Sequence, residues 1–358
     1  TAPIELHGHA ARLATTAVDP AALIDRLRAV CNIDTAVERV ADASRDWWPL
    51  AMHWALRGEV PQLAPVIARP TSTEQVARLL SLCSSHGVPV TAAGGRSGVV
   101  GASVPVFGGV LLDLTAMQGL VSVDETSGIV EVLPGTFGPD LEHQLRIEHA
   151  LTVGHFPQSF DLATVGGWVA CRGAGQYSTR YGKIEHIVAG LEVVLADGSV
   201  IRTGTGPAAA QGPDLTQIFV GSEGTLGVIT RVWLKARPVP PTEGRAAYAF
   251  TSFTDGLEAC RRILRSGATP AVLRLYDAAE SQRGQDGDGT QCILLVLDDE
   301  PSEPKEIRKL ACCFRRIDQR EMVALVRGDG VVSRKRLWFL REWTGDWPLR
   351  TQPFPWID

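Results

Sequence analysis

Residues 154–174 read Gly-His-Phe-Pro-Gln-Ser-Phe-Asp-Leu-Ala-Thr-Val-Gly-Gly-Trp-Val-Ala-Cys-Arg-Gly-Ala and combine a glycine-lined backbone with titratable side chains. A wide, flat, partly polar ligand needs glycines where the backbone must come within contact distance, and a few donors at its edge. Gly166 and Gly167 supply the glycines, and Thr164 supplies a hydroxyl donor. The polar side chains nearby are His155, Ser159, Asp161 and Arg172. The stretch therefore predicts a flavin site.

A second glycine-rich segment, Gly94-Gly-Arg-Ser-Gly-Val-Val-Gly101, follows an expected strand over residues 88–92. Successive backbone N–H groups in such a loop can form a nest for a pyrophosphate. A Rossmann loop would open a long helix, whereas this one leads into Val104-Pro105 and a strand over 109–114. From these residues alone, a phosphate cradle and a tight turn remain equal alternatives.

A third motif, Gly221-Ser-Glu-Gly-Thr-Leu-Gly-Val-Ile-Thr230, runs into a strand that ends near Leu234. Between and before these motifs, apolar periodicity predicts alternating strands and helices. Thr71 or Ser72 can cap one helix, with Glu74 or Gln75 completing a capping box. Strands are expected at 65–68, 120–123, 128–133, 187–195 and 199–203, and helices at 76–86 and 138–149.

The length of 358 residues favours two domains over one core. We predict an N-terminal helical extension over 1–60, a ligand-binding domain over 61–238 and a second α+β domain over 239–358. Pro238, Pro240 and Pro241 mark the later boundary. Beyond it we expect strands at 246–250, 271–276 and 292–297 and a helix at 254–266, and we assign no fold to 301–358.

Composition excludes several classes of protein. A net charge of −5 disfavours nucleic acid as a partner, and the absence of an apolar run of about 18 residues predicts no transmembrane segment. Seven scattered cysteines are typical of reduced thiols in a cytoplasmic protein. No metal site is expected, because zinc spacing is absent and the loop 286–289 lacks the ligand pattern of an EF-hand.

The three motifs together resemble the FAD-binding elements of the vanillyl-alcohol oxidase family, also called the PCMH type. Within it, Ser178-Thr-Arg-Tyr-Gly-Lys-Ile-Glu-His-Ile-Val188 and Ala271-Val-Leu-Arg-Leu-Tyr-Asp277 are similar to alkyldihydroxyacetonephosphate synthase and bacterial FAD-linked oxidases. The resemblance covers roughly residues 40–297. It implies two α+β subdomains that hold FAD, followed by an α+β cap domain that is incomplete in this chain.

The resemblance also implies which residues contact FAD. Residues 92–98 would hold the pyrophosphate, 158–164 and 171–174 would line the flavin, and 223–229 would meet the adenosine half or the ring edge. The predicted contacts are Ala92, Ala93, Gly94, Gly95, Arg96, Ser97, Gly98, Val99, Pro157, Gln158, Ser159, Phe160, Asp161, Leu162, Ala163, Thr164, Gly167, Cys171, Arg172, Gly173, Ala174, Glu223, Gly224, Thr225, Leu226, Gly227, Val228 and Ile229.

Two positions depart from the family pattern, and one absence points to non-covalent FAD. Arg96 stands where relatives usually have glycine, so it either neutralises the phosphates or crowds them. Asp161 stands where the synthases usually have glutamate. The 94–101 loop has neither the histidine nor the cysteine that carries a covalent flavin in this superfamily, so we expect FAD to be held non-covalently.

Two candidate catalytic residues follow from the resemblance, each with a structural alternative. His155 either moves a proton beside the flavin or only shapes the loop, and Arg274 either holds an anionic group or forms a structural salt bridge. Cys171 is expected to be a small buried residue rather than a nucleophile, since no base is assigned to it.

The expected function is FAD-dependent oxidation of a small hydroxylated substrate, which can be anionic. The first alternative is synthase-type alkyl transfer through a flavin adduct in ether-lipid synthesis. Relatives continue past the equivalent of Asp358 into a Tyr- and His-containing catalytic part, so the chain is either a piece of a longer protein or a flavin-binding protein with reduced catalysis. The family alone suggests a homodimer.

Overall fold

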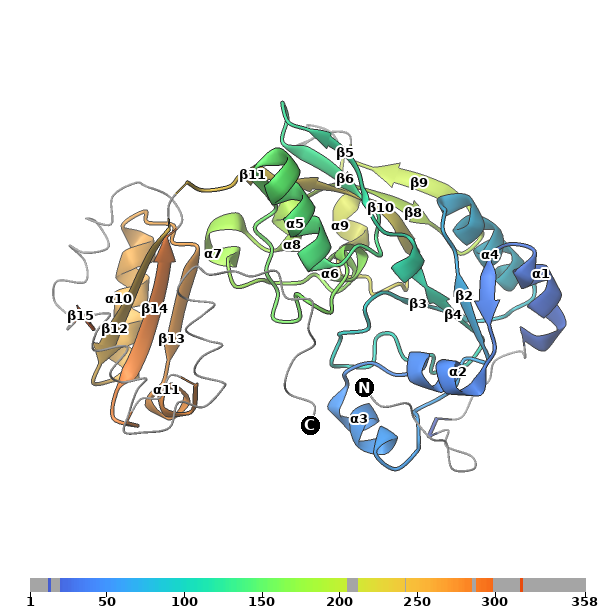
Figure 1. The fold of residues 1–358 in the computed structure, drawn as a ribbon, viewed down its shortest axis with the longest axis horizontal. Helices are drawn as coiled ribbons and strands as arrows, with labels where there is room; N and C mark the ends of the chain where they lie inside the picture. The colour runs from blue at the N-terminus through green and yellow to red at the C-terminus, as the bar shows by residue number, and fades with distance from the viewer. Residues whose placement is uncertain are drawn as a thin grey trace. The chain divides into compact units, whose positions relative to one another are not determined.

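The computed structural model describes residues 12–13, 20–204, 212–241, 243–284, 288–298 and 316–317. It contains two compact units, one ending at Val239 and the other beginning at Pro240 (Figure 1). Nearly all of 301–358, for which no fold is predicted, lies outside the described residues, as do residues 1–11 of the expected extension and half of the 286–289 loop.

The larger unit begins with a four-stranded sheet in the order β1-β2-β4-β3, in which β2 and β3 run parallel to β4 and β1 runs antiparallel to β2. Its strands are β1 (Asn32–Asp34), β2 (Val66–Arg69), β3 (Val90–Ala93) and β4 (Val110–Asp113), with the 3₁₀ turn η2 (Leu114–Ala116) after β4. One face carries η1 (Pro20–Leu23), α1 (Ile24–Arg28) and α4 (Thr73–Ser85) and the other α2 (Val37–Ala43), with α3 (Pro49–Ala55) following (Figure 1).

Local chemistry explains why α4 begins and packs as it does. Ser72 is the N-cap, and its hydroxyl accepts a hydrogen bond from the backbone N–H of Gln75 at 3.3 Å. The Gln75 side chain accepts in turn from the backbone N–H of Thr71 at 2.8 Å. Val76, Leu79, Leu80 and Cys83 recur at helical spacing and are all buried against the sheet.

The N-terminal region is not helical throughout. Strand β1 pairs with β2 through Asn32 to Arg69 and Asp34 to Ile67, so this region extends the sheet as well as covering it. Strand β1 has only three residues, too few to show the alternation from which strands are predicted.

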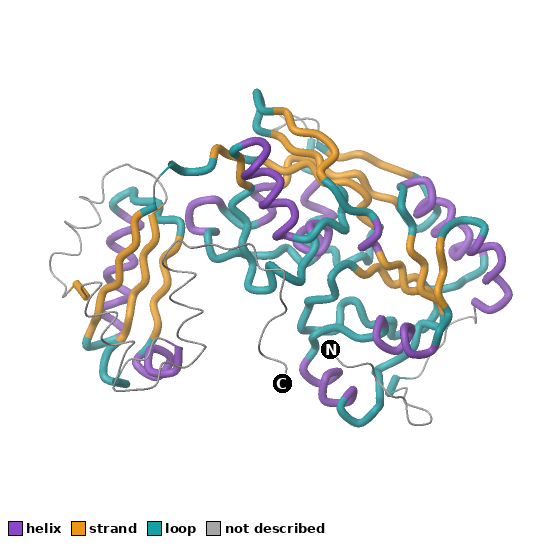
Figure 2. The backbone as a smooth tube through the Cα atoms, in the orientation of Figure 1, coloured by secondary structure: helices purple, strands orange, loops and turns teal. Residues whose placement is uncertain are grey.

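A second, five-stranded antiparallel sheet has the order β5-β6-β10-β8-β9, labelled in Figure 1 and with its strands orange in Figure 2. Its strands are β5 (Leu120–Asp124), β6 (Ile129–Val132), β8 (Val188–Val194), β9 (Val200–Thr203) and β10 (Val228–Lys235). The helices that share its main core are α5 (Gly138–His149), α6 (Val165–Ala170), α8 (Ile184–Ile187) and α9 (Thr216–Phe219). The small pair β7 (Leu151–Thr152) and β11 (Arg237–Pro238) and the short helix α7 (Ser178–Tyr181) complete this part.

Helix α4 joins the two sheets. Val194 of β8 and Val228 of β10 lie in the same core as the α4 side chains. On the same face, the buried Glu192 accepts a hydrogen bond from the Thr73 hydroxyl at 2.7 Å, where α4 begins. The two subdomains of the larger unit are therefore held together by both apolar and polar contacts.

The smaller unit has a sheet in the order β13-β14-β12-β15, and α10 packs on one of its faces. Its elements are β12 (Gly244–Phe250), α10 (Phe253–Arg265), β13 (Val272–Tyr276), α11 (Ala278–Gly284), β14 (Cys292–Asp298) and β15 (Arg316–Ile317). Both units mix helices with largely antiparallel sheets, so the predicted α+β class is confirmed. Among the described residues, no helix has the length and apolar character needed to cross a membrane.

Candidate cofactor site

The first two motifs of the sequence lie against each other. The Ser97 hydroxyl donates to the Ser159 hydroxyl at 3.2 Å. A Cβ on Gly94 would collide with the Thr164 hydroxyl, and one on Gly95 would overlap the backbone carbonyl of Leu162. Glycine is therefore required where the loop 94–101, here called the glycine loop, crosses residues 159–164.

The third motif closes the arrangement. The N–H of Gly221 donates to the Val169 carbonyl at 3.0 Å, and the N–H of Glu223 donates to the Ala170 carbonyl at 3.0 Å. A Cβ on Gly224 would lie 3.5 Å from Cβ of Ala92, at the end of β3. Three segments that are far apart in the sequence thus contact one another pairwise and form a single site.

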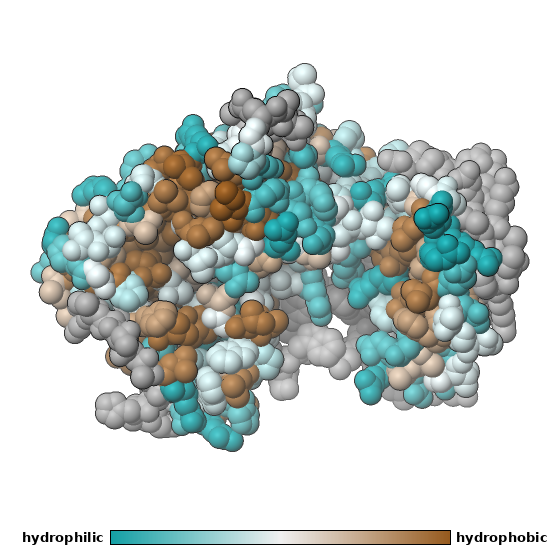
Figure 3. Space-filling view, turned by 180° about the vertical axis from the view of Figure 1, so that it is seen from behind, coloured by the Kyte–Doolittle hydropathy of each residue, from teal (hydrophilic) through white to brown (hydrophobic). Residues whose placement is uncertain are grey.

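The surface of this site suits a large, flat, partly polar ligand. Each motif exposes an apolar side chain: Val99 is 59% exposed, Leu162 39% and Leu226 49%. Apolar residues reach the surface of the protein elsewhere too (Figure 3), so exposure alone does not mark a site. Here, however, the exposed apolar groups accompany a buried Thr164 hydroxyl that has no hydrogen-bond partner among the described residues. A bound ligand can satisfy such a hydroxyl.

His155 is enclosed behind the site. Its side chain is fully buried, and its ring meets that of Trp168 edge to face with the centroids 4.9 Å apart. Burial lowers the pKa of His155 to about 4, against the opposing effect of the Glu185 carboxylate. Neither ring nitrogen has a partner among the described residues. The imidazole is therefore neutral at pH 7, and its role in proton transfer stays a prediction.

The burial of His155 has a measurable effect on stability. The unfolded chain protonates this imidazole near its usual pKa of 6.5, whereas the folded chain does so only near 4. Protons therefore bind more strongly to the unfolded state, and the free energy of unfolding should fall by roughly 2 kcal/mol between pH 7 and pH 5 from this group. Denaturant unfolding at the two pH values should show a smaller decrease for His155→Gln, and an unchanged pH slope in that variant would contradict the assignment.

A matched control is His53→Gln. His53 is exposed on α3 and is not enclosed by the fold. We expect this variant to keep the pH slope of the unvaried chain.

Arg172 and Cys171 face carboxylates. The Arg172 guanidinium lies 3.5 Å from a carboxylate oxygen of Glu185, which also pairs with Lys183 at 2.7 Å. Desolvation raises the pKa of the Cys171 thiol, and the charges of Glu223 and Asp46 raise it further. A protonated thiol is a poor nucleophile. Cys171 is nevertheless exposed, so the prediction that it is a small buried residue is wrong.

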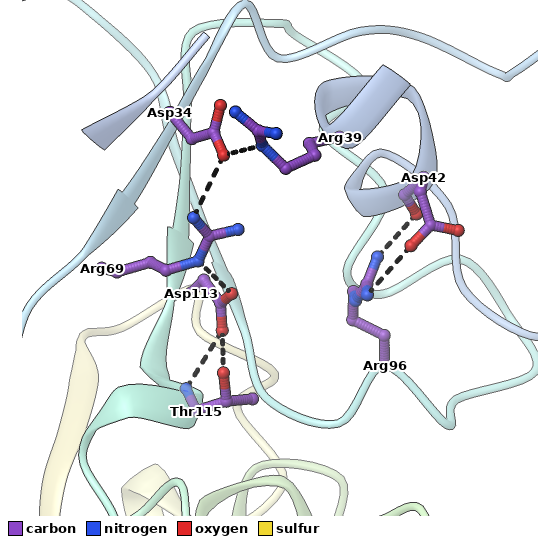
Figure 4. Close-up of polar contacts among 7 residues, drawn as sticks. All are labelled: Asp34, Arg39, Asp42, Arg69, Arg96, Asp113 and Thr115. Carbon is purple, nitrogen blue, oxygen red and sulfur yellow. Dashed lines mark hydrogen bonds and ion pairs between the residues drawn. The ribbon is translucent and has the colours of Figure 1, made fainter. Parts of the chain in front are cut away.

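Arg96 has a partner within the protein. Its Nη1 donates to the backbone carbonyl of Asp42 at 2.6 Å, and its Nη2 lies 3.6 Å from the Asp42 carboxylate. Figure 4 shows the guanidinium pointing toward Asp42 of α2. The same view shows Arg69 between Asp34 and Asp113, a second ion network at the ends of the parallel strands. Whether Arg96 also contacts phosphate stays a prediction.

The remaining predicted contacts differ in position. Gln158, Asp161, Ala174 and Thr225 are exposed within the motifs. Val228 and Ile229 of β10 are buried and belong to the two hydrophobic cores of the larger unit. Arg274 lies on β13 of the smaller unit, exposed and with its guanidinium 5.4 Å from the Tyr276 ring centroid. It belongs to a different unit from His155, so its catalytic role stays a prediction. The described residues contain no group of three or more acidic, histidine or cysteine side chains placed to hold a metal ion.

The sequence-based candidates omit the segment before the FAD-binding region. Asp42, Asp46 and Trp48 contact the glycine loop directly. Asp42 lies in the last turn of α2, and Asp46 and Trp48 lie in the short stretch before α3. Neither place carries a motif, so no sequence signal points to these residues.

Residues 64–204 match the family model described as an FAD binding domain. The match contains the glycine loop and residues 154–174, two of the three contacting motifs. The chain therefore contains an FAD binding domain of the PCMH type, and the predicted cofactor, FAD, is confirmed.

Similar sequences include oxidoreductases and a synthase. The uncharacterized FAD-linked oxidoreductase YgcU of Escherichia coli (strain K12) is 39% identical over 63% of this chain and 47% of that protein. Alkyldihydroxyacetonephosphate synthase of Dictyostelium discoideum is 33% identical over 63% of this chain and 37% of that protein. Glycolate oxidase subunit GlcD of Bacillus subtilis (strain 168) is 32% identical over 59% of this chain and 45% of that protein. The matched region spans less than half the length of each of these relatives.

Solved structures show the same fold. A structure of alkyldihydroxyacetonephosphate synthase superimposes with a TM-score of 0.74 at 23% identity, over 87% of this chain and 64% of that one. A structure of p-cresol methylhydroxylase superimposes with a TM-score of 0.67 at 17% identity, over 90% of this chain and 71% of that one. The predicted PCMH-type fold is thereby confirmed.

Proposed function

We propose that this chain serves an FAD-dependent oxidation of a small hydroxylated substrate, with an anionic group on the substrate as one option. The observation that carries the proposal is the mutual contact of the three motifs around glycines that admit no side chain. The FAD binding domain and the similarity to an FAD-linked oxidoreductase and a glycolate oxidase subunit support it.

In this proposal the protein binds and orients, and bound FAD supplies the capacity to accept a hydride. Backbone N–H groups of residues 94–98 would face the diphosphate, and residues 158–164 with 171–174 would line the flavin. The Thr164 hydroxyl would donate to the ligand edge. His155 would act as a neutral hydrogen-bonding group, because burial keeps its pKa low. We also propose that FAD is held non-covalently, since the glycine loop contains no His or Cys.

Localisation and assembly are proposals of the same kind. Cys31, Cys83, Cys171, Cys260 and Cys292 are free thiols in the described part of the chain. Free thiols are typical of a reducing compartment, so we propose a cytoplasmic location. A homodimer is proposed from the family resemblance alone.

The test is reduction of the bound flavin. The full chain is loaded with FAD, and the visible flavin absorbance is followed without oxygen after addition of glycolate, lactate or a simple alcohol. We expect bleaching by at least one hydroxylated compound and recovery when an electron acceptor is added. Failure of the chain to retain FAD would remove the proposal.

A second candidate is synthase-type alkyl transfer, favoured by the 33% identity to the Dictyostelium synthase. It predicts exchange of an acyl group for an alkyl group with no electron acceptor and no net bleaching. A third candidate is flavin binding without turnover. A yellow protein that no substrate class reduces or converts would support this last candidate.

A further inference from the structure

The glycine loop is held from outside the FAD binding domain. Residues 42–48, here called the clamp segment, precede residues 64–204 and comprise the last two residues of α2 and the connection from α2 to α3. The N–H of Trp47 donates to the Gly98 carbonyl at 2.9 Å. A Cβ on Gly101 would lie 3.2 Å from the Trp48 ring. The clamp segment therefore contacts the glycine loop at two places by main chain and side chain.

Asp46 is the polar centre of this contact. Its side chain is 3% exposed, and its Oδ1 accepts from the N–H of Trp48 at 2.9 Å. Its other oxygen, Oδ2, has no partner among the described residues and lies 3.7 Å from the position of a Cβ on Gly98. Burial raises the pKa of Asp46, and the backbone N–H groups of Trp48, Gly101 and Ser103 lower it in part. The carboxylate thus faces amides at the far end of the glycine loop.

The clamp segment is itself fixed to the sheet. Val40 and Ala43 of α2 pack with Ile67 and Leu111 in a small core. The buried Ser44 hydroxyl accepts from the N–H of Ala64 at 3.1 Å. These contacts fix the clamp segment against the first sheet, so the glycine loop that it contacts is also held in place relative to that sheet.

Asp46 cannot support ligand binding by electrostatic attraction, because its carboxylate and a diphosphate are both negatively charged. A diphosphate is anionic, and the charges of Asp46 and Glu223 both already act on the Cys171 thiol of the second motif. A carboxylate here would repel the ligand, so its benefit must come from fixing the turn of the clamp segment, where Oδ1 accepts from the N–H of Trp48, and thereby keeping in one conformation the loop that Trp47 and Trp48 contact. A preformed loop binds with less ordering cost.

We propose that Asp46 is a positioning residue for the glycine loop, and that the clamp segment is part of the FAD site although it lies outside the FAD binding domain. This inference rests on the proposed placement of the FAD diphosphate at the glycine loop. It predicts that acceptor capacity at position 46, and not negative charge, supports binding.

The experiment compares two substitutions with three probes. Asp46→Ala removes the acceptor, whereas Asp46→Asn keeps one acceptor oxygen and removes the charge. Dissociation constants of FAD, ADP and riboflavin are measured by fluorescence on the full chain. We expect Asp46→Ala to weaken FAD and ADP about tenfold or more, to leave riboflavin within about twofold, and Asp46→Asn to bind all three nearly as the unvaried chain does.

The control is Asp25→Ala on α1, because Asp25 is in the same N-terminal region but its side chain is 96% exposed. Equal weakening of all three probes by Asp46→Ala would indicate general loss of structure and overturn the inference, as would unchanged FAD binding. If the unvaried chain binds neither FAD nor ADP, the proposed function fails and the inference fails with it. If the unvaried chain and Asp46→Ala bind FAD equally well, the inference about Asp46 is wrong while the proposed function is unaffected.

Hydrogen exchange of the unvaried chain gives a measurement that needs no variant. The N–H groups of Trp47 and Trp48 are hydrogen-bonded in the clamp. We expect them to be protected like the amides of β3 in the FAD-free chain. Exchange at the rate of exposed loop amides would contradict a preformed clamp.

Discussion

Replacing Gly95 with alanine is expected to weaken FAD binding by roughly 5- to 150-fold. The new Cβ would overlap the backbone carbonyl of Leu162, which cannot rotate away as a side chain can. Either the glycine loop or the flavin-lining segment must therefore move. Overpacking of this kind costs about 1–3 kcal/mol, which corresponds to roughly 5- to 150-fold in a dissociation constant. The FAD content of the purified chain and an FAD titration measure the effect.

Gly244→Ala is the matched control for Gly95→Ala. A Cβ on Gly244 would lie 3.7 Å from the Asp298 carbonyl, an ordinary contact, and Gly244 belongs to the smaller unit. This variant should bind FAD as the unvaried chain does. Full FAD content in Gly95→Ala would show that the two motifs do not need their close approach.

Replacing Glu192 with alanine is expected to lower the free energy of unfolding of the larger unit by roughly 1–3 kcal/mol. Glu192 is 3% exposed and accepts from Arg202 at 2.8 Å, Thr73 at 2.7 Å and Thr230 at 3.1 Å, while Arg231 lies 3.5 Å away. A register shift in β10 turns both Thr230 and Arg231 toward it. Removing the carboxylate leaves several donors without their acceptor. Urea unfolding followed by circular dichroism measures the loss.

Two variants separate the causes of the Glu192 effect. Glu192→Gln keeps an acceptor oxygen of similar size and should lose less than Glu192→Ala. Glu258 on α10 also pairs with two arginines but lies on the surface, so Glu258→Ala should change stability little. A Glu192→Ala loss no larger than that of Glu258→Ala would refute the role assigned to this network.

Local signals in the sequence predicted many elements well. The helix at 138–149 has the bounds of α5, and Ser72 caps α4 as one of the two residues proposed for it. The Asp197-Gly198 signal lies between β8 and β9, where Gly198 has a φ of +90°. These features depend on residues a few positions apart, so spacing and turn chemistry are sufficient to find them.

The sequence could not show how His155 and Arg96 would be surrounded. His155 was a candidate base because of its motif, but enclosure by Trp168 and neighbouring backbone lowers its pKa. The resemblance predicts that Arg96 lies beside phosphate, whereas its guanidinium donates to the carbonyl of Asp42, 54 residues earlier. Burial and partners depend on distant segments, which no local pattern records.

The sequence by itself determined the α+β class, the three glycine-rich motifs and a flavin site, because these follow from short patterns that backbone geometry and a flat ligand impose. The resemblance of the three motifs to a known family specified FAD. Only the tertiary structure decided that the three motifs touch, that β1 extends the first sheet and that Asp46 lies under the glycine loop. Those contacts form when chain segments that are far apart in sequence bury surface against one another. Which segments meet depends on the packing of the whole core, which no short pattern records.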